Sequence, residues 1–165
     1  MTGISKLRFV HLSDIHFNNR IASFGFDPDR ALRGILTQDI AEMREKWGRA
    51  DAVLVTGDIA FSGKRAEYED AAAWLDEVCD AAGCGKESVL MCPGNHDVDQ
   101  EVIRSNPLIQ DGHDAVRRGQ THFDRDTALT SRLVQPDARA LFYSPISAYN
   151  DFAARYQSSF FADTV

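Results

Sequence analysis

The sequence contains neither a long apolar run nor an excess of positive charge. The chain has 165 residues and a formal net charge of -7, and its apolar runs are far shorter than the roughly 20 residues that a membrane-spanning helix needs. The opening stretch MTGISKLRFVHLSD also lacks the apolar region and cleavage site of a signal peptide. We therefore expect a cytoplasmic protein with no membrane partner and no extended basic face for nucleic acid.

Cysteine is scarce, and the usual nucleotide-binding motifs are missing. The three cysteines, Cys79, Cys84 and Cys92, form no C-x-x-C pair, so we expect reduced structural thiols rather than a disulfide framework or a zinc knuckle. Neither G-x-G-x-x-G nor the phosphate-binding loop G-x-x-x-x-G-K-[ST] occurs. These absences exclude the dinucleotide-binding and P-loop classes of protein.

Three short apolar runs of strand length are present, and helical patterns separate them. The runs are LRFVHL at 7–12, AVLVT at 52–56 and SVLMC at 88–92. Apolar residues recur at helical spacing from about residue 27 to Gly48, and again from about residue 67 to Gly83. With 44% hydrophobic residues available for a core, the order β-α-β-α-β predicts an α/β fold with a parallel sheet.

Each helical pattern has a start signal and an apolar stripe. Asp27 is placed to cap the first helix, with Pro28 as its first residue, and acidic residues open the second. The stripes expected to face the core are Leu32, Ile35, Leu36, Ile40, Met43 and Trp47 in the first helix, and Tyr68, Leu75, Val78, Cys79 and Ala82 in the second.

The sheet predicts where a site should lie. Ligands of parallel sheets bind beyond the carboxyl ends of the strands, so the loops that begin at Ser13, Gly57 and Pro93 should meet at one edge. The nearly continuous apolar strands also indicate burial on both faces of the sheet.

The chain after Asp99 is broken by prolines and gives weaker signals. A helix is expected near 121–134, and a second helix is suggested by an aromatic stripe at helical spacing. This stripe either packs against the rest of the domain or forms a partner or oligomer surface. Its members are Tyr149, Phe152, Tyr156 and Phe160.

The first two loops carry side chains that suit a metal ion. In an extended segment Asp14 and His16 point the same way, and a carboxylate with an imidazole favours Mn²⁺, Fe or Zn²⁺ over Ca²⁺. Asp58 follows the second strand and Gly57, so it could bridge two ions at the same edge. Taken singly, Asp14 and His16 also fit a solvated surface pair, and Asp58 also fits an aspartate that caps the backbone of its own turn.

The third loop, MCPGNHDVD, places three polar groups directly after a turn. Pro93 and Gly94 fit the central positions of a type II turn, in which Gly adopts positive φ. Asn95 can offer an amide oxygen to a cation, and His96 can hold a phosphate or donate a proton to a leaving oxygen. Asp97 is expected to fix the tautomer of His96.

D-x-H, G-D and G-N-H-D at successive strand ends resemble the first three motifs of the calcineurin-like metallophosphoesterase family, over about residues 7–99. The resemblance implies two divalent metal ions, Mn²⁺ in first place with Fe or Zn²⁺ as alternatives, and a metal-bridging hydroxide that attacks phosphorus. It also implies the residue roles: Asp14 and His16 on the first metal, Asp58 as the bridge, Asn95 on the second metal, and His96 with Asp97 serving the phosphate and leaving group.

The resemblance is incomplete, because the family adds a further metal-binding histidine and a G-H-x-H motif. This chain has five histidines and no G-H-x-H; His113 and His122 are expected to be loop residues, and His11 a strand residue turned away from Asp14. We therefore expect 1–99 to be the first half of a four-layer αββα sandwich, with 100–165 a helical or irregular insertion or a continuation. Such a half should expose an apolar sheet face or cover it by forming a dimer.

The predicted function is a metal-dependent phosphoesterase, and more specifically a phosphodiesterase acting on a phosphate ester such as a cyclic nucleotide or nucleic acid. The missing ligands would come from a homo-oligomer or from a C-terminal half. The alternative is an incomplete, non-catalytic scaffold or sensor module that acts through protein partners. The absent G-H-x-H favours this alternative, whereas the intact His96-Asp97 pair favours the enzyme.

Overall fold

Residues 6–18, 27 and 29–158 are described by a computed structural model, in which the chain folds as two units. Unit 1 combines the chain up to Val98 with the segment from Ala148 onwards, and unit 2 is Asp99–Ser147. The predicted metal and catalytic residues all belong to unit 1.

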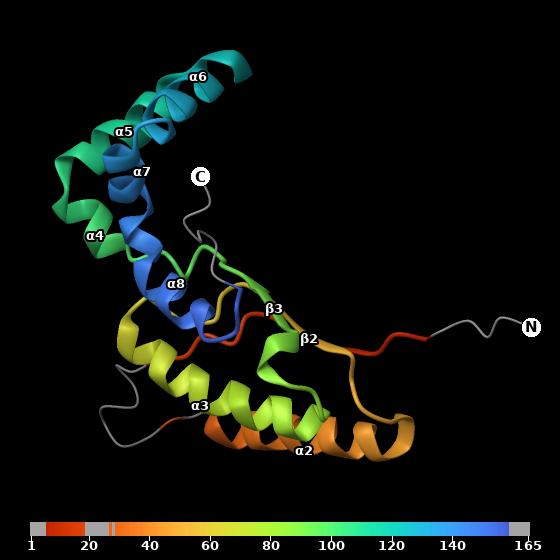
Figure 1. Ribbon diagram of the computed structural model, residues 1–165. Coiled ribbons are helices and arrows are strands. Elements are labelled where there is room, and N and C mark those ends of the chain that lie inside the picture. Colours follow the sequence, from red (N-terminus) through yellow and green to blue (C-terminus); the bar gives the residue numbers. More distant parts are fainter. Residues whose placement is uncertain (1–5, 19–26, 28, 159–165) are drawn as a thin grey trace, which may run out of the picture. The chain divides into compact units, whose positions relative to one another are not determined.

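Unit 1 is built on a three-stranded parallel sheet with the order β1-β2-β3 (Figure 1). The register places Val10 beside Val53 and Val53 beside Val89. Both connections between strands contain a helix, which confirms the predicted β-α-β-α-β order and the α/β class. The elements are β1 (Phe9–Leu12), α2 (Arg30–Trp47), β2 (Ala52–Thr56), α3 (Arg65–Ala82), the 3-10 turn η1 (Lys86–Ser88) and β3 (Val89–Cys92).

The stripe of α3 forms the core of unit 1 as predicted, since all five of its members are buried. Helix α2 lies beside α3 (Figure 1), and the indole N–H of Trp74 donates to the Thr37 hydroxyl at 3.1 Å across the two helices. Gly83 ends α3 in the left-handed conformation with φ 73°. None of the helices in the described part of the chain is long and apolar enough to cross a membrane.

The start of α2 differs from the prediction. Its N-cap is Asp29 rather than Asp27, and Pro28 lies outside the described residues. Asp27 instead accepts the Asp29 N–H at 3.1 Å and forms an ion pair with the buried Arg33. The carboxylate thus stabilises the residues around the helix start from one turn earlier in the chain.

One face of the sheet is exposed, so the prediction of burial on both faces is wrong for this chain. Phe9 and Leu90 are 52% and 57% exposed, and His11, Thr56 and Cys92 on the same face are exposed as well. The predicted stripe of α2 is also largely open, with Ile35 and Trp47 at 63% and 64% exposure. These open apolar surfaces confirm the expectation of an uncovered sheet face. The strands are apolar on both sides, but helices of the described chain cover only one of them.

The aromatic stripe near the end of the described chain packs inside unit 1. Helix α8 (Ser147–Ala154) and the residue Tyr156 return to α3, where the ring of Phe152 stacks on Tyr68 at 5.2 Å between centroids. The Tyr156 hydroxyl donates to the Ala72 carbonyl at 3.2 Å. Tyr149, Phe152 and Tyr156 are each at most 2% exposed. These three therefore pack against the rest of the domain, which is the first of the two predicted alternatives. Phe160 lies outside the described residues.

Unit 2 is helical. Its first and last turns meet, because the Asp99 N–H donates to the Pro145 carbonyl at 2.8 Å. The predicted helix near 121–134 is present, whereas His113 and His122 lie in helices rather than in loops, because Pro107 begins the helix that contains His113 and Thr121 caps the helix that begins at His122. Its elements are α4 (Gln100–Ser105), α5 (Pro107–Arg118), α6 (His122–Leu133), α7 (Pro136–Tyr143) and the 3-10 turn η2 (Ser144–Ile146).

Candidate metal centre

The loops after β1 and β2 run side by side beyond the ends of the strands. The His16 N–H donates to the Asp58 carbonyl at 3.0 Å, and the Phe17 N–H donates to the Ile59 carbonyl at 2.8 Å. The parallel pairing of the two strands is therefore resumed past their carboxyl ends. This pairing brings the D-x-H and G-D residues to one edge of the sheet, where the sequence predicted a site.

The backbone at these residues is strained rather than extended. Asp14, His16 and Asp58 have φ angles of 57°, 54° and 53°, and they are three of the four described non-glycine residues with positive φ. The left-handed conformation is unfavourable for residues with a Cβ and persists where surrounding contacts enforce it, often at functional sites. The expectation that Asp14 and His16 align through an extended strand is therefore wrong. Bends in the backbone at Asp14 and His16 place the two side chains instead.

The second and third loops approach each other through two glycines. A Cβ on Gly57, which has φ 91°, would lie 2.9 Å from the Cα of Gly94. A Cβ on Gly94 would collide with the backbone and carboxylate of Asp58. Gly94 is not among the described glycines with positive φ, so the predicted type II turn is wrong. Gly94 is required for close approach, because any side chain there would occupy the space of Asp58.

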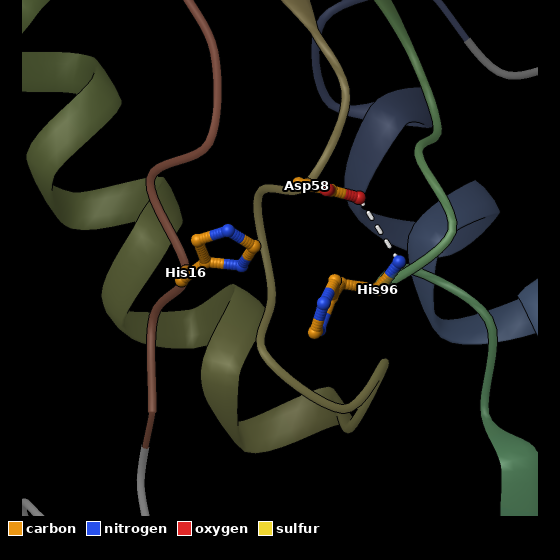
Figure 2. Close-up of side chains that lie close together, drawn as sticks. All are labelled: His16, Asp58 and His96. Atoms are coloured by element: carbon orange, nitrogen blue, oxygen red, sulfur yellow. Dashed lines mark hydrogen bonds between the residues drawn. The ribbon is translucent and has the colours of Figure 1, made fainter.

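Three predicted residues form a cluster at the junction of the loops (Figure 2). His16, Asp58 and His96 each offer one ligand atom, and these atoms lie within 4.8 Å of one another. The His96 backbone N–H donates to Asp58 Oδ1 at 2.9 Å, and the rings of His16 and His96 lie edge to face with centroids 4.6 Å apart. Three loops that are distant in sequence thus contribute one group each.

The chemistry of the cluster fits a divalent transition metal. Two imidazoles and a carboxylate combine borderline nitrogen with hard oxygen, a set that suits Mn²⁺, Fe or Zn²⁺. In addition, His16 Nδ1 is buried without a hydrogen-bond partner among the described residues. A buried polar atom of this kind is costly unless a cation or water satisfies it. The described residues whose ligand atoms lie close enough together to share one metal ion are therefore His16, Asp58 and His96.

Asp14 lies beside this cluster, and Asn95 is the chain neighbour of one of its members. Asp14 Oδ1 is 4.0 Å from His16 Nε2, its side chain is 69% exposed, and it accepts a hydrogen bond from the Ser13 hydroxyl. Asn95 directly precedes His96 and is exposed. Both residues are near enough in the chain to contribute ligands, and their roles stay predictions.

The His96 ring is oriented by a backbone carbonyl. Its Nδ1 lies 2.8 Å from the Phe61 carbonyl oxygen, and because a carbonyl only accepts, Nδ1 must carry the hydrogen. In the neutral ring Nε2 then has the lone pair, and in the charged ring it has a proton to donate. This arrangement is the one that metal-bound and acid-base histidines use.

Asp97 occupies a different place from the predicted one. Its carboxylate is fully buried and accepts four hydrogen bonds, two on each oxygen. A carboxylate offers about four lone-pair sites, so these donors fill it and Phe61 takes the expected orienting role towards His96. Asp97 thus joins the second loop, the third loop and α3. The donors are the N–H groups of Ile59 (3.2 Å), Ala60 (2.9 Å) and Gly94 (2.8 Å) and the hydroxyl of Tyr68 (2.9 Å).

Comparison with known proteins agrees with this geometry. The family described as calcineurin-like phosphoesterase matches residues 7–147, which is most of the chain. The chain belongs to this family. The cluster formed by the D-x-H, G-D and G-N-H-D motifs is therefore a candidate metal-binding group in a member of a phosphoesterase family, and the fold is consistent with the N-terminal part of the family's domain.

Two curated relatives are similar over part of their length. An uncharacterized metallophosphoesterase-like protein, YydB of Bacillus subtilis (strain 168), is 31% identical over 100 residues, covering 61% of this chain and 19% of the relative. Glycerophosphodiester phosphodiesterase GpdQ of Enterobacter lignolyticus (strain SCF1) is 34% identical over 89 residues, covering 53% of this chain and 28% of the relative. The matches thus span only 19% and 28% of the relatives' length.

Three residues that support the candidate metal centre were not predicted. Glu67 is 2% exposed and accepts the N–H groups of Ser62 and Lys64, each at 3.0 Å, which holds the loop after Asp58 against the start of α3. Tyr68 donates to Asp97, and its pKa is raised mainly by burial and further by the Asp97 charge. Phe61 contacts both imidazoles. The spacing Lys64-x-x-Glu67 was the one usable signal, because a glutamate at the third helical position often accepts the capping N–H.

His11 stays outside the metal centre, as predicted. Its Nε2 lies 2.7 Å from the Thr56 hydroxyl on the exposed face of the sheet. The side chain therefore has a hydrogen-bonded strand role, and both imidazoles of the candidate metal centre come from loops.

Proposed function

We propose that this chain carries the metal-binding and proton-donating part of a phosphodiesterase. The observation that supports the proposal best is the cluster of His16, Asp58 and His96, held by three strained or glycine-dependent loops. Bound divalent cations, Mn²⁺ first, would lower the pKa of a water and neutralise charge on phosphoryl oxygens. A phosphate ester is then the substrate that the cluster fits.

Each residue in and around the cluster would have a separate role. His16 and Asp58 would bind cations, with Asp58 bridging two of them, while Asp14 and Asn95 would complete the ligand shells. His96, with Nδ1 fixed by the Phe61 carbonyl, would present Nε2 to the leaving oxygen and donate a proton there. Asp97 would act as a positioning residue that keeps the second and third loops together.

Phosphodiester rather than monoester chemistry is supported by the likeness to GpdQ, which is named as a glycerophosphodiester phosphodiesterase. A cytoplasmic location is supported by the three free cysteines, because secreted proteins commonly pair theirs. We further propose that residues 1–99 are the first half of the catalytic domain. The remaining ligands would come from a C-terminal half or a second copy.

The test is hydrolysis of bis-p-nitrophenyl phosphate by the Mn²⁺-loaded protein and its variants. We expect Asp58→Ala to abolish turnover because the bridging carboxylate is lost, and to lower the Mn²⁺ stoichiometry measured by calorimetry. His122→Ala is the matched control, because this histidine lies in unit 2 and should leave both readouts unchanged. Unchanged turnover and metal content in Asp58→Ala would refute the proposed mechanism.

The role of His96 needs its own comparison, since it is also near enough to bind metal. If His96 donates a proton, His96→Ala should lower the rate by about 10²–10⁴ for an alkyl ester and far less for a nitrophenyl ester, whose leaving group needs no proton. An equal loss for both esters, accompanied by loss of Mn²⁺, would instead assign His96 to the metal.

The alternative of a non-catalytic scaffold or sensor is favoured by the absence of G-H-x-H from the sequence. Metal stoichiometry separates the two functions. About two Mn²⁺ ions per chain would support the enzyme, one ion would indicate an incomplete centre, and none would support the scaffold.

A further inference from the structure

The ring of Phe61 stands at the edge of the metal centre and is open to solvent. The residue is 43% exposed, its ring centroid lies 5.5 Å from that of His96, and 6.3 Å from that of His16. An aromatic side chain in such a position exposes apolar area that the core does not use. A group bound at the cluster would come within reach of the ring.

The backbone that carries the ring is held by hydrogen bonds on both sides of the peptide. The Phe61 N–H donates to the Phe17 carbonyl at 3.0 Å, and the Phe61 carbonyl accepts from His96 Nδ1 at 2.8 Å. The next residue, Ser62, donates through both its N–H and its hydroxyl to the buried Glu67. The backbone of Phe61 therefore belongs to a hydrogen-bonded loop, which keeps this residue next to the two imidazoles.

This geometry discriminates between substituents on phosphorus. A phosphoryl group bound near His16 and His96 would have the Phe61 ring as a neighbour, because its centroid lies 5.5 Å from that of His96, and an ester substituent can be directed toward it. A flat apolar substituent can stack on such a ring, whereas a small or polyhydroxylated one gains little from it. We infer that Phe61 is a specificity-determining residue that selects phosphate esters with an aromatic or other flat apolar substituent. This inference rests on the proposed phosphoesterase function and names its substrate class.

Binding of two inert phosphonates tests the inference without requiring turnover. Phenylphosphonate and methylphosphonate carry the same anionic group and differ in the substituent on phosphorus. For the Mn²⁺-loaded chain we expect calorimetry to show about tenfold tighter binding of phenylphosphonate. Phe61→Ala should reduce this preference to about twofold or less, and Phe61→Tyr, which keeps the ring, should retain it.

A second exposed phenylalanine provides the matched control. Phe123 in α6 is 78% exposed and belongs to unit 2, so Phe123→Ala should keep the full preference. Equal binding of the two phosphonates by the unmodified chain, or a preference that survives in Phe61→Ala, would overturn the role of Phe61 and leave the phosphoesterase proposal intact. Binding of neither phosphonate would overturn both.

Discussion

The two units use their carboxylates in opposite ways. In unit 1 Asp97 and Glu67 are buried and accept hydrogen bonds from loops, and the partners of Asp97 include residues 37 and 38 positions earlier in the chain. In unit 2 Asp124 accepts the N–H of Thr121, three residues away, and Asp114 pairs with arginines three and four residues along its own helix. The buried carboxylate of Asp97 thus joins segments that are distant in the chain, whereas Asp124 and Asp114 contact neighbours within their own helices or caps.

The difference explains where a metal centre can form. Strained bends such as those at His16 and Asp58 persist only if distant parts of the chain hold them, and a buried carboxylate with several donors supplies that constraint. Helices stabilised by caps and by neighbours three or four residues away need no such support, but they also fix no loop relative to another. Unit 1 can therefore preorganise a site, and the contacts of unit 2 serve its helices.

The largest effect is expected on removing the carboxylate that joins the loops. Asp97→Ala would leave the N–H groups of Ile59, Ala60 and Gly94 and the Tyr68 hydroxyl without their acceptor, each at a cost of about 1–3 kcal/mol. We expect a loss of at least about 3 kcal/mol in the free energy of unfolding, measured by urea denaturation, together with loss of Mn²⁺ binding.

Asp114→Ala is the matched control in unit 2. The Asp114 side chain is 46% exposed and its arginine partners are exposed too. The free energy of unfolding should therefore change by no more than about 0.5 kcal/mol. Equal destabilisation by the two substitutions would contradict the contrast between the units.

A smaller effect is expected from a single methyl group at the contact between loops. In Gly94→Ala the new Cβ would collide with Asp58, so the loops must separate, at a cost of about 1–3 kcal/mol and with weaker Mn²⁺ binding. Gly34→Ala is the opposite case, because nothing lies within 4 Å of a Cβ there and the residue is inside α2. That substitution should stabilise the chain by about 0.5–1 kcal/mol. If thermal unfolding showed that both substitutions stabilise the chain, or that both destabilise it, the close approach at Gly94 would not be a constraint.

The sequence predicted the frame of unit 1 well because its signals are local. The run AVLVT became β2 residue for residue, and the stripe of α3 is buried, since period and β-branching report on a single element. The edge of the sheet that carries His16, Asp58 and His96 also followed from the strand order alone.

The errors concern contacts between elements that are distant in sequence. Of the four donors to Asp97, only the Gly94 N–H is close in sequence, whereas Ile59, Ala60 and Tyr68 reach it only after the loops and α3 meet. The local sequence therefore did not show that Asp97 faces these donors rather than His96. The positive φ of Asp14, His16 and Asp58 is invisible in residue types that also occur in extended backbone. The open stripe of α2 was misjudged for a related reason: periodicity identifies an apolar face but not whether anything covers it.

The smallest effect is expected from removing most of unit 2. The Asp99 N–H and the Pro145 carbonyl are 2.8 Å apart, so the two ends of the unit lie next to each other and a short Gly-Ser linker can replace residues 100–144. Since unit 1 draws its core from the sheet, α3 and α8, we expect its free energy of unfolding to change by less than about 1 kcal/mol, with Mn²⁺ binding retained. Phe152→Ala in α8, by contrast, removes a side chain that is 2% exposed and should cost about 3–5 kcal/mol. The opposite result would be loss of cooperative unfolding or of Mn²⁺ binding in the shortened chain, with both retained in Phe152→Ala. The metal centre would then depend on unit 2, and the contrast between buried and exposed carboxylates would not explain how the site is held.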